Sequence, residues 1–201
     1  MDILQGIFEG IKELTILEVL GVFFGLLSVL YAKRESILVF PTGIISVLIY
    51  VYICFNARLY ADMSINAYYF VMSVYGWYYW SRKDDTKHNT PITKNTKKDW
   101  IWSITILLVS FVVLSQLLIH FTDSDVPIID ALTTSVFFVG MQLMAKKKIE
   151  NWLAWIIGDF ISIPLYYYKG LVLTSFQFFV FFIIAIFGYL SWKKTLELST
   201  T

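Results

Sequence analysis

The sequence has few of the residues on which many protein functions depend. It contains one cysteine, Cys54, and two histidines, His88 and His120, among 201 residues. A disulfide within one chain and a metal site built from cysteine or histidine are therefore not expected. Charged residues make up 15% of the chain, and the formal net charge is +1. Without a strongly basic surface, nucleic acid is not an expected partner, and no cofactor is expected either.

Apolar and aromatic residues dominate instead. Hydrophobic residues make up 58% of the chain and aromatic residues 18%, which is typical of an integral membrane protein. A bilayer core is crossed by about 20 apolar residues in a helix. Runs of roughly that length lie at about 16–32, 37–55, 63–80, 100–121, 128–145, 151–168 and 171–192. The sequence therefore predicts an all-α integral membrane protein with seven transmembrane helices.

Two further patterns describe how the chain meets the membrane. Apolar residues of the segment 1–14 fall on one helical face, which predicts an amphipathic helix in the membrane interface. If every run crosses the bilayer, thirteen of the sixteen lysines and arginines lie on one side. Because cytoplasmic loops carry the excess of basic residues, we expect the N-terminus outside. The C-terminus and the polar loop 81–99 are then cytoplasmic.

The first three runs resemble the last three in the order of their landmarks. Three helices, a linker helix and three similar helices make a 3+1+3 parallel repeat, with a substrate site between the halves near the bilayer midplane. The alternative is a chance match between apolar segments. The paired landmarks are Ala32 with Ala145, Ser46 with Ser162, Gly76 with Gly188 and Trp80 with Trp192. The predicted parts are the amphipathic helix 1–14, a first bundle 15–80, the loop 81–99, a linker helix and turn 100–127, a second bundle 128–194 and a tail 195–201.

The stretch from Lys146 to Gly170 is the first candidate for a binding site. A carboxylate in the middle of a lipid-length helix costs roughly 3 kcal/mol, and Asp159 stands in such a run. Trp152, Trp155, Asp159, Ser162 and Tyr166 recur at spacings of three and four, so they share one helical face. This face suits a polar cavity better than lipid. The alternatives are an interfacial position for Trp152 and a hydrogen bond from a neighbouring helix to Asp159.

Other runs supply polar groups at similar depth. Gln142 stands in the fifth run, Asn66 and Tyr69 in the third, and Gln177 near the start of the seventh. Hydrogen bonds between helices are the alternative role for each of them. A pocket lined by tryptophan with one carboxylate suits an aromatic cation, because cation–π attraction can reach about 2 kcal/mol when desolvated.

Several segments resemble the PnuC family of bacterial B-vitamin transporters. They are QLMAKKKIENWLAWIIGDFISIPLYYYKGLVLT, GYLSW at 188–192, PTGIIS at 41–46 and YGWYYW at 75–80. The resemblance implies uptake of nicotinamide riboside by facilitated diffusion across the bacterial inner membrane. It also implies the fold of the sugar-transporting SWEET proteins, a homotrimer and a functional link to a cytoplasmic vitamin kinase. The ligand contacts implied by the family are Asn151, Trp152 and Trp155, with Gln142 as a further candidate.

Other functions are open at this point. Thiamine is also a flat-ring cation, whereas riboflavin is larger and uncharged and fits Asp159 less well. An enzyme is not expected, because no nucleophile and base or paired carboxylates stand at suitable spacing. No phosphate-binding loop of the GxxxxGK[ST] type is present. A seven-helix sensor and an ion-coupled transporter remain as more distant alternatives.

Overall fold

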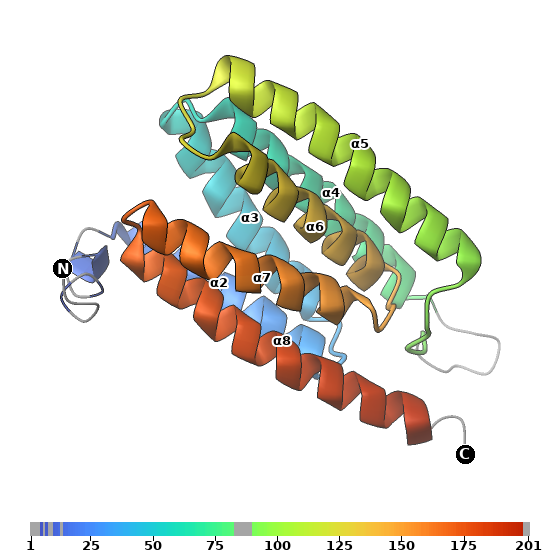
Figure 1. Cartoon of the computed structure of the whole chain (residues 1–201). Coiled ribbons are helices and arrows are strands. Elements are labelled where there is room, and N and C mark those ends of the chain that lie inside the picture. Colours follow the sequence, from blue (N-terminus) through green and yellow to red (C-terminus); the bar gives the residue numbers. More distant parts are fainter. Residues whose placement is uncertain (1–4, 6, 8–9, 13, 83–89, 199–201) are drawn as a thin grey trace.

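The computed structural model describes residues 5, 7, 10–12, 14–82 and 90–198. Long helices make up almost all of this part of the chain (Figure 1). They are α2 (Ile16–Lys33), α3 (Val39–Asn56), α4 (Tyr60–Trp80), α5 (Lys97–Phe121), α6 (Pro127–Ala145), α7 (Asn151–Tyr168) and α8 (Val172–Leu198). The predicted amphipathic helix over 1–14 lies mostly outside the described residues.

Local sequence explains where several helices begin and end. Thr15 and Glu18 form a capping box at the start of α2, and Thr96 and Asp99 form another at the start of α5. Such a box satisfies backbone N–H groups that the first helical turn leaves unpaired. Helix α5 therefore begins before the apolar run that predicted it. Helix α8 continues to Leu198, so the predicted tail 195–201 starts inside a helix.

Six of the helices form a closed ring. Contacts run from α2 to α3, α3 to α4, α4 to α6, α6 to α7, α7 to α8, and from α8 back to α2. Among the described helices, α5 packs on α6 alone, and Figure 1 shows it at the edge of the molecule. The ring leaves a central space that α5 does not reach.

The outer surface of the ring is apolar. Phe23 on α2, Leu48 on α3 and Phe179 on α8, for example, are exposed, which is favourable in lipid and unfavourable in water. Five of the described helices, α2, α3, α5, α6 and α8, are long and apolar enough to cross a membrane. The predicted runs over α4 and α7 are less apolar because they contain polar residues such as Asn66 and Asp159.

Helices α2–α4 form one group of three and helices α6–α8 another, and corresponding features of the two groups are separated by a constant number of residues. Helices α3 and α7 begin 112 residues apart and each spans 18 residues, and α4 and α8 also begin 112 residues apart. The turns match as well. Glu35 (φ 56°) and Lys147 (φ 55°) both have positive φ, as do Arg58 (φ 59°) and Gly170 (φ 75°), and each pair is again 112 apart.

Candidate functional site

A cavity of about 690 Å³ lies inside the ring of six helices. Every helix of the ring contributes to its lining, and α5 contributes nothing. Sites for small molecules and cofactors usually have volumes of about 300–1,000 Å³. The cavity is therefore large enough for a vitamin.

Most of the predicted binding residues meet in this cavity. Gln142 and Asn151 are the two that do not line it. The Asn151 side chain is fully buried, and its Nδ2 donates to the Lys148 carbonyl oxygen at 2.6 Å. Gln142 is also buried, and its Oε1 has no hydrogen-bond partner among the described residues. The lining residues from the predicted set are Asn66, Tyr69, Trp152, Trp155, Asp159, Tyr166 and Gln177.

Asp159 lines the cavity and is 3% exposed. No hydrogen bond or ion pair to its carboxyl group is formed within the described part of the chain. The alternative of a hydrogen bond from a neighbouring helix is therefore not found among these residues. A buried carboxylate without a partner is costly, so a cationic ligand beside Asp159 would stabilise the ionised form of this group.

Aromatic rings from α6, α7 and α8 form one continuous wall of the cavity. Phe137 stacks on Trp155 with ring centroids 5.5 Å apart and on Phe178 at 5.9 Å. Tyr166 stacks on the same Phe178 at 5.0 Å. Trp155 also packs closely on α6, where a Cβ on Gly140 would lie 3.2 Å from Trp155 Cε2. The sequence pattern predicted Trp155 and Tyr166 but missed the two phenylalanines, which stand among many other aromatic residues.

The wall from α2, α3 and α4 is different, because it is built from small residues. We call this set the serine wall; it consists of Gly25, Ser28, Gly43, Ser46 and Ser73, all of which line the cavity. Sequence reasoning did not include it in the site. The available signal was a glycine followed three positions later by a serine, once on α2 and once on α3, which places the two residues of each pair on one helical face.

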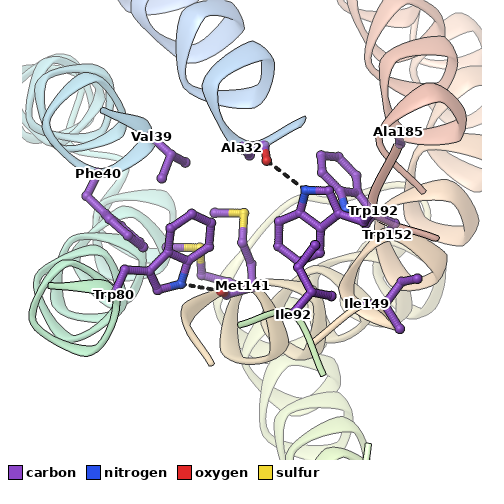
Figure 2. Packing of buried hydrophobic residues seen from close by; sticks show 11 residues of the cluster. Ala32, Val39, Phe40, Trp80, Ile92, Met141, Ile149, Trp152, Ala185 and Trp192 are labelled. Atoms are coloured by element: carbon purple, nitrogen blue, oxygen red, sulfur yellow. Dashed lines mark hydrogen bonds between the residues drawn. The ribbon is translucent and has the colours of Figure 1, made fainter. Parts of the chain in front are cut away.

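One end of the cavity is closed by an aromatic layer of Phe40, Trp80, Trp152 and Trp192 (Figure 2). Phe40 and Trp80 meet edge to face at 5.0 Å, and Trp152 and Trp192 do the same at 5.5 Å. Trp80 and Trp192 themselves are 5.9 Å apart. All four side chains are buried, so this end of the cavity is sealed by apolar contacts.

Two hydrogen bonds join the helix groups across this layer. Trp80 Nε1 on α4 donates to the Met144 carbonyl oxygen at 3.2 Å on α6, and Trp192 Nε1 on α8 donates to the Ala32 carbonyl oxygen at 2.9 Å on α2 (Figure 2). Both carbonyls belong to the last turn of their helix. Each indole therefore ties one group of three helices to the other.

Residues 90–96, just before α5, cover the same end from outside. Thr93 N–H donates to the Lys147 carbonyl oxygen at 3.2 Å, and Ile149 N–H donates to the Thr93 carbonyl oxygen at 3.0 Å. The buried Lys147 Nζ donates to the Thr90 carbonyl oxygen at 2.8 Å and lies 3.2 Å from the Glu35 carboxylate. These contacts connect the α2–α3 turn, the α6–α7 turn and this segment.

The opposite end of the cavity has a carboxylate and a phenol among its lining groups. Glu18 and Tyr166 line the cavity there. Near the start of α6, Asp130 pairs with Lys169 at 2.6 Å and accepts a hydrogen bond from Ser124 Oγ at 2.6 Å. The lining of the two ends therefore differs, with Trp152 at one end and Glu18 and Tyr166 at the other, while the Asp130–Lys169 pair lies outside the lining.

A ring of helices with an apolar outer face and an internal cavity defines a multi-pass membrane protein. Comparison with known proteins gives the family. A family model described as nicotinamide mononucleotide transporter matches residues 15–194. The chain therefore belongs to this family, which is that of the PnuC transporters.

Curated relatives span most of this chain. The nicotinamide riboside transporter PnuC of Escherichia coli (strain K12) is 24% identical over 91% of this chain and 87% of its own length. That of Neisseria mucosa is 26% identical over 86% and 70%. The riboflavin/roseoflavin transporter RibM of Streptomyces davaonensis is 20% identical over 87% and 83%.

One solved structure has the same fold. The crystal structure of the vitamin B3 transporter PnuC matches with a TM-score of 0.69 and 22% identity, covering 90% of this chain and 82% of the other. At that identity the likeness establishes the fold alone. The family and its relatives are transporters rather than enzymes.

Proposed function

We propose that this protein takes up nicotinamide riboside through the central cavity by facilitated diffusion with alternating access. The observation that carries the proposal is an unpaired buried carboxylate, Asp159, in a cavity with a stacked aromatic wall. Nicotinamide riboside is a flat aromatic cation joined to a sugar. The E. coli and N. mucosa relatives named as nicotinamide riboside transporters support this choice of substrate.

Each side chain has a role in this proposal. The cationic ring stacks on Trp155, whose position is fixed by Phe137 and Gly140. Asp159 balances the positive charge. The buried Trp152 Nε1, which has no hydrogen-bond partner among the described residues, is a donor available to the substrate. Tyr69, Asn66 and Gln177 supply further polar groups, while Gln142 and Asn151 support the wall from behind.

The charge of the lining separates the riboside from its phosphorylated form. Among the described residues that line the cavity there is no lysine or arginine. A phosphate would therefore enter a cavity without a cation to balance its charge, and burying an unbalanced charge is costly. We expect nicotinamide mononucleotide to bind poorly, although the family model carries its name.

Transport by alternating access needs two halves that can rock against each other. In our proposal, α2–α4 and α6–α8 are parallel repeats joined by α5, which makes a fold of seven transmembrane helices. The common spacing of 112 residues supports this, because it relates helix starts, turn conformations, Phe40 to Trp152 and Trp80 to Trp192. This register replaces two of the sequence pairings: Ala32 corresponds to Met144, and Ser46 corresponds to Gly158.

The two ends of the cavity then act as gates. Opening the end closed by the aromatic layer requires the loss of the Trp80 and Trp192 hydrogen bonds. By the excess of basic residues this end faces the cytoplasm, so the N-terminus is outside. We also propose, from the family resemblance, that the protein lies in the bacterial inner membrane and forms a homotrimer. A cytoplasmic kinase then traps the vitamin by phosphorylation.

The test is direct binding to purified protein in lipid nanodiscs. Nicotinamide riboside should bind more tightly than thiamine, riboflavin or nicotinamide mononucleotide. Tighter binding of thiamine would contradict the proposed substrate. In proteoliposomes, uptake should follow the riboside gradient alone. If uptake needs an imposed proton or sodium gradient, facilitated diffusion is wrong and Asp159 becomes the first candidate for ion coupling.

A further inference from the structure

The serine wall faces the cavity at positions where the other half of the ring carries aromatic rings. In the 112-residue register Gly25 corresponds to Phe137, and Gly43 corresponds to Trp155. The two glycines instead let α2 and α3 pack closely, because a Cβ at either position would meet a serine hydroxyl of the other helix. Small residues by themselves do not make a binding site. Whether this wall can bind a ligand depends on the hydroxyl groups around the glycines.

Three serine hydroxyl groups surround the two glycines. A Cβ on Gly43 would lie 3.0 Å from Ser28 Oγ and 3.9 Å from Ser73 Oγ, and a Cβ on Gly25 would lie 3.2 Å from Ser46 Oγ. The Ser28 and Ser73 hydroxyls thus lie within 4 Å of one point on the wall. They come from different helices, α2 and α4, so their proximity is a product of the fold.

Their hydrogen bonds show which groups remain available. Ser28 Oγ donates to the Val39 carbonyl oxygen at 2.7 Å, and Ser46 Oγ donates to the Gly21 carbonyl oxygen at 2.8 Å. Both hydroxyl protons are used in these bonds, so the two oxygens can act toward a ligand only as acceptors. Ser73 is 4% exposed, lines the cavity and has no partner within the described part of the chain. Its hydroxyl can donate and accept.

A ligand that matches this wall must donate to the Ser28 and Ser46 oxygens and exchange a hydrogen bond with the Ser73 hydroxyl. Two neighbouring hydroxyl groups on the ligand can do this. Resting on the proposed function, we infer that the serine wall is a diol-binding subsite that selects vitamins carrying a sugar or a polyol chain. The ring of the substrate stacks on Trp155, and its hydroxyl groups reach Ser28, Ser46 and Ser73. Nicotinamide riboside and riboflavin carry neighbouring hydroxyl groups. Thiamine has a single hydroxyl and cannot fill the subsite.

The experiment compares Ser73→Ala with a matched control, Ser103→Ala. Ser103 lies on α5 outside the cavity, is also 4% exposed, and its Oγ likewise has no partner among the described residues. Affinities for nicotinamide riboside and for its 2′-deoxy and 3′-deoxy analogues are measured by calorimetry on the full chain in nanodiscs. Thermal unfolding of each variant checks that it is folded.

Wild-type protein and the control should prefer the riboside to at least one deoxy analogue by about 5-fold, the size expected for one hydrogen bond. Ser73→Ala should weaken riboside binding by a similar factor and remove that preference. Equal affinities of Ser73→Ala and wild type for the riboside overturn the inference, and so does tighter wild-type binding of thiamine. If wild-type protein binds riboflavin but not the riboside, and Ser73→Ala weakens riboflavin binding, the proposed substrate is wrong while the diol subsite is supported.

Discussion

The two indole hydrogen bonds across the aromatic layer give the sharpest prediction about transport. Replacing Trp80 and Trp192 by phenylalanine keeps an aromatic ring at each position and removes the N–H donors that bind the Met144 and Ala32 carbonyls. A hydrogen bond of this kind contributes about 1 kcal/mol. Each substitution should raise the population open at this end by about 5-fold, and the double variant should raise it by about 30-fold.

The assay is the rate at which a membrane-impermeant thiol reagent reaches the cavity. Val47 lines the cavity and can be changed by Val47→Cys after the single native cysteine has been removed by Cys54→Ser. In inside-out vesicles the reagent meets the end closed by the tryptophans. Labelling should be slow with both indoles present, and the two substitutions should accelerate it by the factors above. Trp102→Phe, at an exposed position on α5, is the control.

The reasoning is refuted if the double variant labels at the rate of the parent. It is also refuted if the parent already labels equally fast in inside-out and right-side-out vesicles, because the layer would then not close the cavity. Faster labelling in right-side-out vesicles alone would mean that the assigned orientation is reversed.

Three further predictions concern charge and packing. Asp159→Asn should weaken nicotinamide riboside binding by about 10-fold and leave neutral riboflavin unaffected, whereas Asp125→Asn at an exposed turn should change neither; calorimetry measures both. Lys147→Met removes the ion pair of a buried lysine with the partly exposed Glu35 and the hydrogen bond to the Thr90 carbonyl oxygen, so it should destabilise the protein by about 2 kcal/mol, measured by thermal unfolding in detergent. Gly188→Ala places a Cβ 2.6 Å from Trp152 Cη2, so it should shift this indole, lower the unfolding temperature and weaken binding together.

Sequence patterns predicted the helices because each boundary is set locally. Apolar runs end at charged residues or at residues that take positive φ, such as Glu35 and Lys147. Helical periodicity also placed Trp155, Asp159 and Tyr166 on the face that lines the cavity. These features depend on spacing within a single helix, which a sequence displays directly.

The remaining features depend on how the helices close into a ring. The bond from Trp192 to Ala32 joins residues 160 positions apart, and no local pattern indicates it. The serine wall was missed for the same reason, since Ser28 and Ser73 become neighbours only when α2 and α4 both pack on α3. The proposed register pairs Ser46 with Gly158 instead of the Ser162 suggested by the sequence, where one serine in an apolar run resembles another.

The 112-residue register separates what the two halves share from what they do not. At the closed end they share tryptophans, glycines and turn conformations, so each half supplies the same contacts to the seal. In the middle of the cavity the register pairs different residues: Gly43 corresponds to Trp155, and Val47 corresponds to Asp159. In the proposed mechanism, a gate between two halves that rock against each other works equally well when the halves are alike. The proposed substrate has a charged ring at one end and hydroxyl groups at the other, so its site requires the halves to differ where they contact it.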